Sequence, residues 1–279
     1  MDSNTSDSAA LDSTAGDSTV DSTVIGAYLD RLGITGSRAP DAAFLRELQE
    51  RHLLAIPFEN IDVHLGVPIR VGPAAVAKVA GGRGGTCREL NGSAFPALLT
   101  ALGYRPVLLG SQVFVDGTPN FPLAHTVIRV DCPDPWLVDV GFGRDAPRFP
   151  LRLDVRGPQA DPNGEYEFVD GPDGQVDLLR DAEPLLRVDP RPRALAEFLP
   201  VLRWFETAPE SPFRTSLFCT RLTEHGRVTL RGDRLSWTDG EHRDSVTLGS
   251  DAEITAAYAE HFGITLDRLP RIPDRPEDT

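Results

Sequence analysis

The feature that most constrains this chain is a glycine-rich turn that stops at a cysteine. Residues 83–87 read Arg-Gly-Gly-Thr-Cys, and apolar residues at helical spacing follow. The pattern predicts a helix that begins at Cys87. A thiol at a helix N-terminus lies beside unpaired backbone N–H groups and the positive end of the helix dipole. Both favour the thiolate, which is the nucleophilic form of cysteine.

Most lone cysteines are small apolar fillers of a protein core. Cys132 and Cys219 are interpreted in this way, because neither follows a glycine turn or precedes a helix start. Cys87 is interpreted differently because of its turn and because suitable partners lie downstream.

Two candidate partners occupy neighbouring segments rich in β-branched residues. Residues 125–130 and 136–141 favour strands, and the short turn between them, with two prolines, indicates an antiparallel hairpin. Pairing about that turn places His125 opposite or nearly opposite Asp139, where Cβ atoms lie roughly 5 Å apart. The order Cys87, His125, Asp139 then predicts a nucleophile, a base and an orienting carboxylate. Two structural roles stay open: His125 could bond the backbone, and Asp139 could cap a turn or pair with Arg129.

At several separated places the chain resembles the arylamine N-acetyltransferase family. The resemblance rests on residues 56–62 (Ile-Pro-Phe-Glu-Asn-Ile-Asp), residues 83–92, the strand opened by His125, residues 138–143 (Val-Asp-Val-Gly-Phe-Gly) and residues 209–213 (Pro-Glu-Ser-Pro-Phe). These matches run in order from about residue 24 to about residue 262.

The resemblance implies a catalytic triad of Cys87, His125 and Asp139 that moves an acetyl group from acetyl-CoA, a co-substrate, to an arylamine, hydrazine or N-hydroxyarylamine. It implies no metal. Substrate binding is expected at four further residues: Phe58, Gly141, Phe142 and Gly143. The alternative for Phe142 is an aromatic plug at the end of a barrel.

The implied fold is α+β, with a Cys-His-Asp core similar to that of papain-like proteases and transglutaminases. A disordered acidic tail (1–22) precedes a helical domain (23–104) that carries Cys87. A β-barrel domain (105–192) carries His125 and Asp139, and an interdomain segment (193–225) leads to an α/β lid (226–279). Local patterns favour helices over 24–32, 43–54, 73–79, 195–205 and 252–262, and strands over 227–230 and 234–238. Pro200 is expected to limit the helix over 195–205.

Some residues depart from the family's pattern. Thr86 and Arg88 flank the cysteine where the family commonly has bulkier or aromatic residues, and Arg144 stands where a glycine is frequent. Three other functions therefore stay open: an amide synthase of the same family that forms a macrolactam from a polyketide thioester, a transglutaminase-like or papain-like hydrolase, and a binding module with a vestigial triad. Within the family-like stretches, Arg83 and Glu59 are expected to pair and to fix the glycine turn.

Composition excludes some partners. The net charge of −14 and the lack of a basic patch argue against nucleic-acid binding. No apolar run is long enough to span a bilayer, and the N-terminus lacks the basic and apolar regions of a secretory signal. Three cysteines without metal-type spacing fit a reducing compartment, so a cytoplasmic location is expected. A phosphorylated ligand could meet Arg144, Arg148 and Arg152, although a solvated face is the favoured interpretation of these arginines.

Overall fold

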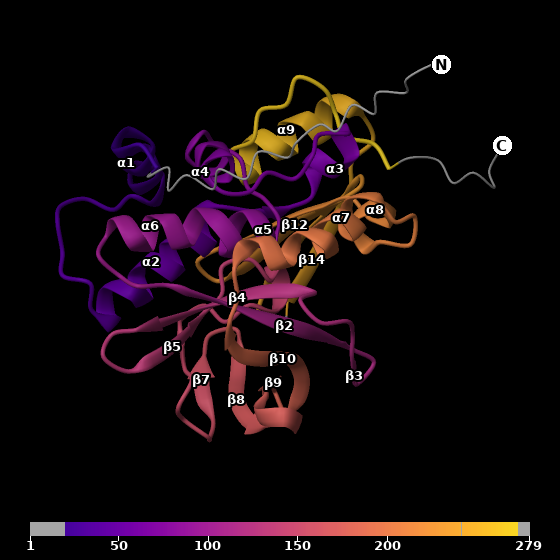
Figure 1. Cartoon of the computed structure of the whole chain (residues 1–279). Coiled ribbons are helices and arrows are strands. Elements are labelled where there is room, and N and C mark those ends of the chain that lie inside the picture. The colour runs from indigo at the N-terminus through magenta and orange to yellow at the C-terminus, as the bar shows by residue number, and fades with distance from the viewer. Residues whose placement is uncertain (1–19, 241, 273–279) are drawn as a thin grey trace, which may run out of the picture.

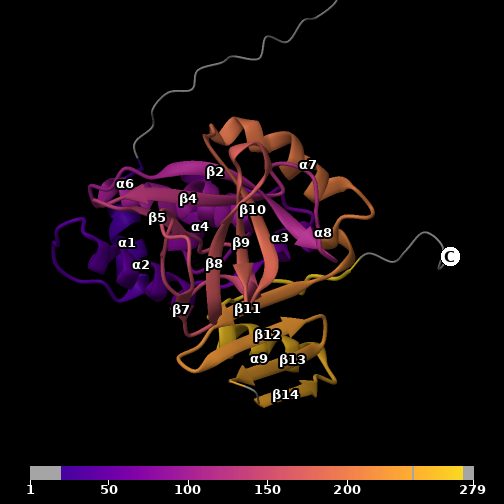
Figure 2. The ribbon, with the colours of Figure 1, turned by 90° about the horizontal axis from the view of Figure 1, so that it is seen from below.

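The computed structural model describes residues 20–240 and 242–272 and combines helices with two sheets. Figures 1 and 2 show the N-terminal helices beside a large curved sheet, with the second sheet and the last helix at another side of it. Most of the predicted acidic tail lies outside the described residues. No helix in the described part of the chain is both long and apolar enough to cross a membrane.

Helices build the first third of the chain, as the sequence predicts. The first helix, α1 (Ser22–Leu32), begins after Asp21, whose side chain accepts a hydrogen bond from Thr23 N–H, and it ends at Gly33 in the left-handed conformation. The helices that follow are α2 (Ala42–Ala55), α3 (Ile61–Leu65), α4 (Pro73–Ala80), α5 (Cys87–Glu89) and α6 (Phe95–Ala101). The predicted helices over 24–32, 43–54 and 73–79 are confirmed to within two residues. The five-residue helix α3 is too short to show a periodic pattern.

The helix that starts at Cys87 contains a wider turn. A π-helical segment, Leu90–Ala94, joins α5 to α6. Directly after it, Pro96 has no N–H to donate to the carbonyl of Gly92, so a regular α-helical bond is lost at this point. Insertions of this kind are frequent at functional sites, and this one carries Asn91.

A nine-stranded antiparallel sheet forms the middle of the chain. Its order is β6-β5-β4-β2-β10-β9-β8-β7, and β3 pairs with β2. The strands are β2 (Val107–Val115), β3 (Thr118–Pro119), β4 (His125–Asp131), β5 (Pro135–Val138), β6 (Leu151–Arg152), β7 (Gln159–Asp161), β8 (Gly164–Asp170), β9 (Val176–Arg180) and β10 (Glu183–Pro192). Apolar side chains from these strands form one shared core inside the curved sheet, among them Leu109, Val127, Leu137, Tyr166, Phe168 and Leu178.

Side chains join the two edges of this sheet and nearly close it into a barrel. The amide of Gln159, on β7, accepts a hydrogen bond from Arg152 N (2.8 Å) and donates one to Arg152 O (2.9 Å) on β6. The carboxylate of Asp161 accepts bonds from the backbone N–H groups of Arg148 and Phe149, both at 3.0 Å. These side chains satisfy backbone groups that a neighbouring strand would otherwise pair.

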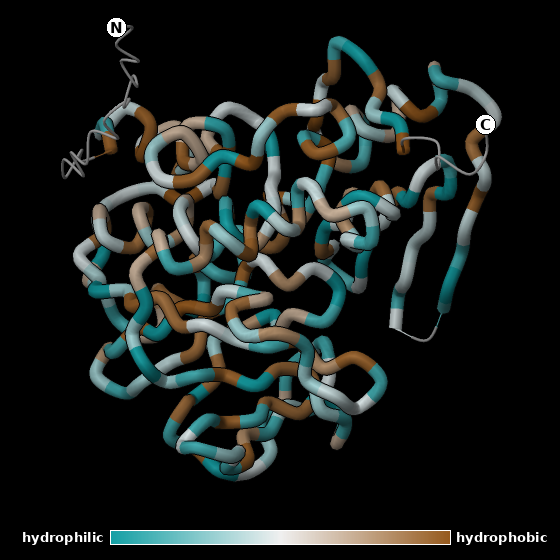
Figure 3. The backbone as a smooth tube through the Cα atoms, turned by 45° about the vertical axis from the view of Figure 1, so that its right-hand side comes forward, coloured by the Kyte–Doolittle hydropathy of each residue, from teal (hydrophilic) through white to brown (hydrophobic). Residues whose placement is uncertain are grey.

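The second sheet draws its strands from distant parts of the chain. Its order is β1 (Phe58–Glu59), β11 (Phe218–Leu222), β12 (Gly226–Arg231), β13 (Arg234–Asp239) and β14 (His242–Thr247), and α9 (Asp251–Phe262) packs against it. The predicted strands over 227–230 and 234–238 and the helix over 252–262 are confirmed. Figure 3 shows the β13–β14 hairpin standing at the edge of the molecule. Because β1 and β11 lie within the ranges 23–104 and 193–225, the sheet crosses two expected domain boundaries, and the division into domains stays a prediction.

The segment before β11 corrects one expectation. A 3-10 turn (Leu195–Phe198) leads into α7 (Leu199–Thr207), and α8 (Pro212–Thr215) follows. Pro200 therefore lies in the first turn of α7 rather than limiting it. A proline is tolerated at this position because the first N–H groups of a helix have no intrahelical acceptor.

Candidate active site

The glycine turn before Cys87 fits tightly between the backbone of Pro57 and the side chain of Glu89. A Cβ at residue 84 would lie 2.0 Å from the carbonyl oxygen of Pro57, and one at residue 85 would lie 2.8 Å from the Cβ of Glu89. The turn also pairs with β1, because Glu59 N–H bonds to the Gly85 carbonyl at 3.0 Å. Glycine is therefore required here for close approach rather than for an unusual φ angle.

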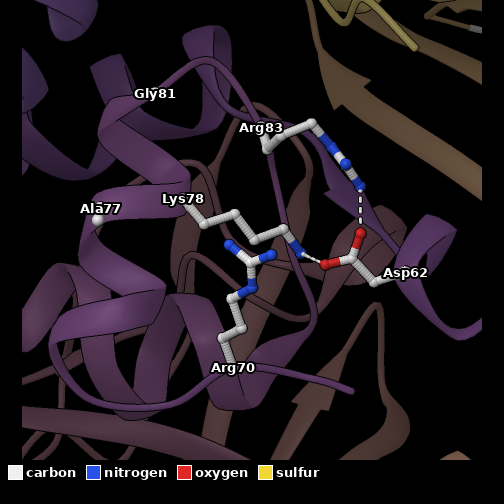
Figure 4. A pocket seen from close by; sticks show the side chains of 6 residues that line it. All are labelled: Asp62, Arg70, Ala77, Lys78, Gly81 and Arg83. Atoms are coloured by element: carbon white, nitrogen blue, oxygen red, sulfur yellow. Dashed lines mark hydrogen bonds and ion pairs between the residues drawn. The ribbon is translucent and has the colours of Figure 1, made fainter. Parts of the chain in front are cut away.

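A buried cluster of charges supports the turn from behind. Glu89 accepts a hydrogen bond from Thr86 N–H (2.8 Å) and pairs with the Nζ of Lys78 (2.7 Å). In Figure 4, Lys78 and Arg83 reach Asp62 from two sides, at 2.9 Å each. The expected pair of Arg83 with Glu59 is confirmed at 3.0 Å.

Burial opposes ionisation in this cluster, but opposite charges surround the basic groups. Burial tends to lower the pKa of Lys78, yet its three carboxylate neighbours raise the pKa above the ordinary value. Burial raises the pKa of Glu89, which Lys78 only partly offsets. The cluster thereby ties the start of α5 to β1, α3 and α4.

Cys87 itself is buried, with 4% of its surface exposed. Burial raises the pKa of its thiol, but the charge of Arg88 and then the hydrogen bond and charge of His125 outweigh burial, so the pKa lies below the ordinary value. The local charges therefore favour the thiolate.

His125 and Asp139 are in direct contact. The Nε2 atom of His125 lies 2.8 Å from Oδ2 of Asp139, and both side chains are buried. Burial tends to lower the pKa of the imidazole, but Asp139 and then Cys87 raise it to about 9. Because Nε2 faces the carboxylate, Nδ1 is the ring nitrogen left for the thiol.

The predicted hairpin of β4 and β5 is confirmed, whereas the cross-strand pairing of the two residues is not observed. The β4–β5 ladder runs from Asp131 and Pro135 to Ile128 and Val138, and Asp139 is the next residue after β5. Within the sheet, His125 is paired with a residue of β2. The contact is made by the side chains alone.

Two polar residues that no sequence pattern marks as functional hold Asp139. Asn91 Nδ2 donates to Oδ1 of Asp139 at 2.6 Å, and Gln49 Oε1 accepts from the N–H of Asp139 at 3.3 Å. The N–H of Gly141 also donates to Oδ1, at 2.9 Å. Asn91 lies four residues after Cys87, the spacing of side chains on one helix face, and this spacing could have identified it. The alternative partner of Asp139 is ruled out, since Arg129 pairs with Asp131.

The four residues expected to bind substrate gather beside these three. At residue 141 a Cβ would lie 3.0 Å from the Cα of Cys87, and at residue 143, where φ is +76°, it would lie 2.9 Å from the ring of Phe58. The Phe142 ring centroid lies 4.8 Å from that of His125. Phe142 also packs against two core clusters, as the barrel-plug alternative requires.

A cavity of about 1080 Å³ opens next to this loop. Phe58, Phe142 and Gly143 belong to its lining, together with residues of the barrel and of strands β11 to β14. Its basic lining residues outnumber the three acidic ones: they are Arg144, Arg148, Arg180, Arg227, Arg231, Arg234 and Arg243.

One half-buried arginine of this cavity is incompletely paired. Burial lowers the pKa of Arg227 to about 10, and its Nη2 atom has no hydrogen-bond partner within the described ranges. Of the three arginines considered from sequence, Arg144 and Arg148 line the cavity, whereas Arg152 pairs with Asp134 and Asp154. The cavity therefore suits an anionic ligand.

Comparison with known proteins identifies the class. Residues 41–271 match the family model described as N-acetyltransferase. The chain belongs to the arylamine N-acetyltransferase family and is an acyltransferase, so the resemblance seen in the sequence is confirmed.

Individual relatives cover most of the chain. An arylamine N-acetyltransferase of Mycobacterium tuberculosis is 34% identical over 253 residues, which cover 86% of this chain and 89% of the relative. The structure of the Salmonella typhimurium enzyme matches with a TM-score of 0.81 at 26% identity, covering 91% of this chain and 96% of that one. The Mycobacterium marinum enzyme in complex with CoA matches with a TM-score of 0.77 at 32% identity, covering 86% and 92%. The mixed helix-and-sheet fold with a barrel-like sheet is therefore that of this family.

The opposite pKa shifts of Cys87 and His125 predict how stability depends on pH. The raised imidazole pKa stabilises the folded state fully below pH 6.5, and this contribution is lost as pH rises towards 9. The lowered thiol pKa acts in the opposite direction, since its contribution is lost as pH falls. Between these pH values the folded pair holds one proton on the imidazole, and the unfolded chain holds one proton on the thiol, so the two contributions largely cancel.

The variant Cys87→Ser removes the contribution of the thiol to the pH dependence of stability and leaves that of the imidazole. We expect its free energy of unfolding, measured with urea, to fall more steeply between pH 6.5 and 9 than that of the wild type. The double variant Cys87→Ser/His125→Asn is the control and should lose the steep fall. Parallel profiles for the wild type and Cys87→Ser would contradict the coupled pair.

Proposed function

We propose that this chain transfers an acetyl group from acetyl-CoA to an arylamine, hydrazine or N-hydroxyarylamine through a thioester on Cys87. The observation that carries the proposal is the buried 2.8 Å contact of His125 with Asp139 beside a thiol whose pKa is lowered. The family supports it, because the relatives are named arylamine N-acetyltransferases.

In the first half-reaction the Cys87 thiolate attacks the thioester carbonyl of acetyl-CoA. A new bond forms between the Cys87 sulfur and the carbonyl carbon, and the bond from that carbon to the CoA sulfur breaks. His125, protonated because its pKa is about 9, gives its proton to the departing CoA thiolate. Asp139 holds the ring and favours its protonated form.

In the second half-reaction the amine nitrogen attacks the acetylated sulfur's carbonyl carbon. His125, now neutral, accepts the proton that the amine loses, and the Cys87 thiolate leaves. The products are the acetylated amine and the original ion pair. The same ring nitrogen, Nδ1, serves both steps, since Nε2 stays bonded to Asp139.

The arginine-lined cavity is the proposed binding site of the acyl donor. Its residues fit a phosphorylated ligand, because Arg227 offers a buried, unpaired donor and the other arginines surround it. The complex of the Mycobacterium marinum relative with CoA supports this assignment of ligand class. In this arrangement the thioester end of the donor would pass Phe142 to reach Cys87.

Phe58 and Phe142 are the proposed contacts of the aromatic acceptor. Phe142 lies beside His125, and Phe58 stacks on Phe218 with centroids 5.4 Å apart. An aromatic amine stacked between such rings would lie close to the base that takes its proton. The expected cytoplasmic location stays a prediction.

Mass spectrometry after incubation with acetyl-CoA alone tests the first half-reaction. We expect the mass of one acetyl group on the peptide that contains Cys87, no gain in Cys87→Ala, and wild-type gain in Cys219→Ser, which alters another buried cysteine. Adding an arylamine or a hydrazine should discharge the label and yield the acetylated product. If the acetyl label is lost to water equally fast with and without the amine, the protein is a hydrolase. If a polyketide thioester labels Cys87 in preference to acetyl-CoA, the protein is an amide synthase. If acetyl-CoA leaves no label at all, the proposal is overturned.

Removing the charge of Arg227 tests the donor site. Arg227→Met should raise the KM for acetyl-CoA about tenfold or more, because a charge-assisted contact to phosphate is lost, and should leave the KM for acetyl-pantetheine, which lacks the nucleotide, nearly unchanged. Arg152→Met, outside the cavity, is the matched control. Equal effects of Arg227→Met on both donors would contradict a phosphate contact.

A further inference from the structure

Arg88 follows the nucleophile directly and is one of the largest fully buried side chains of the protein. Only 1% of its surface is exposed. The reaction proposed above assigns it no role.

The guanidinium contacts the sulfur of Cys87. Its Nη1 atom lies 3.6 Å from Sγ and also donates to the hydroxyl of Thr126. Its Nη2 atom donates to the carbonyls of Leu123 and, at 3.1 Å, Ala124. The group lies over the ring of Phe198, 4.8 Å from its centroid. These contacts hold the cation against the sulfur from the side of α5.

Among the described residues, no carboxylate forms an ion pair with the buried charge of Arg88. Across residues 20–240 and 242–272, none of the ion pairs between side chains includes Arg88. Carbonyl and hydroxyl oxygens accept hydrogen bonds from Nη1 and Nη2 but do not neutralise the charge, and Nε has no partner among the described residues. A buried cation without a counter-ion is costly, and the group in contact with it that can become an anion is the Cys87 thiol.

We propose that Arg88 is a catalytic residue, a permanent counter-ion that keeps Cys87 ionised whether or not His125 carries a proton. The proposal rests on the proposed function in taking Cys87 as the nucleophile. The charged groups that face the sulfur are Arg88 from α5, His125 from β4 and Asp139 after β5. Of the two cations, only His125 loses its charge during the reaction.

In this arrangement His125 transfers protons, and Arg88 stabilises the thiolate. In the second half-reaction His125 must be neutral to accept the proton of the amine, so it cannot at first stabilise the thiolate that leaves. Arg88 keeps its charge throughout, because a guanidinium does not lose its proton in this range. A more stable thiolate is a better leaving group, so Arg88 should favour discharge of the acetyl-enzyme.

The test is the pH dependence of Cys87 alkylation by iodoacetamide, followed on the peptide that contains Cys87. The single variants are His125→Asn, Arg88→Gln and Arg88→Lys, and the double variant is Arg88→Gln/His125→Asn. Arg88→Gln removes the charge and keeps hydrogen-bond donors, whereas Arg88→Lys keeps the charge. We expect the midpoint of His125→Asn to stay at least about one pH unit below the ordinary thiol value. The midpoint of the double variant should rise to about 8.5 or above, because burial and Asp139 both raise the thiol pKa once the two cations are gone. At pH 6.5 the double variant should then react about tenfold more slowly than His125→Asn.

Arg88→Lys in the His125→Asn background should restore most of the low midpoint, which a purely structural role would not do. The matched control is Arg221→Met, because Arg221 also donates to backbone carbonyls, those of Leu54 and His261. It should lower the melting temperature and leave the Cys87 midpoint unchanged.

A midpoint near 8.5 in His125→Asn alone, or equal midpoints for His125→Asn and the double variant, would overturn the role of Arg88. The first of these measurements needs no Arg88 variant, so it holds even if Arg88→Gln does not fold. Alkylation uses no acyl donor, so the two proposals can fail separately. If the midpoint of His125→Asn is low but acetyl-CoA does not label the wild type, the proposed function is rejected and the role of Arg88 as counter-ion is kept.

Discussion

The buried hydrogen bond between Asp139 and His125 is the interaction on which the site depends. A carboxylate with 1% of its surface exposed is stable there only because three donors meet it: the imidazole, the amide of Asn91 and the N–H of Gly141. Each donor comes from a different element, so the helix after Cys87, strand β4 and the loop after β5 must all be in place before the carboxylate is satisfied. The carboxylate of Asp139 thus joins the barrel to the N-terminal helices.

The charged groups behind the nucleophile form a cluster separate from those in front of it. Behind the glycine turn, Lys78 and Arg83 are matched by Glu59, Asp62 and Glu89, and this cluster fixes the backbone. In front, the sulfur faces imidazole and guanidinium, with one carboxylate beyond the imidazole. The first group holds the backbone of the turn in place, and we propose that the second keeps the thiol ionised.

Local patterns in the sequence predicted the elements better than their contacts. Helices α1, α2, α4 and α9 and the β4–β5 hairpin follow from periodicity and turn residues, and the glycine turn indicated Cys87 as the residue of interest. The contact of His125 with Asp139 was predicted correctly for a partly incorrect reason, since it arises where the strand ladder has already ended. Such contacts depend on the path of the loop, which has no periodic signal.

Residues that act through tertiary contacts were the hardest to foresee. Gln49 lies 90 positions before Asp139, and no spacing rule joins them. Residues 218–221 favour a strand, but the place of this strand, β11, between β1 and β12 was not predicted, because it depends on residues far apart in the chain. Arg88 was noticed only as a departure from the family's pattern; its contact with the sulfur required the fold.

Nitrogen-15 NMR of the histidine side chains across pH tests the central claim most directly. Of the six imidazoles in the chain, that of His125 should stay protonated through pH 8 and titrate near 9, and the signal should disappear in His125→Asn. Burial lowers the pKa values of His52 and His64, so neither can be mistaken for it. If every imidazole in the wild type has lost its proton by pH 7.5, Asp139 does not hold a charged His125 against the thiolate, and the account of the site is wrong.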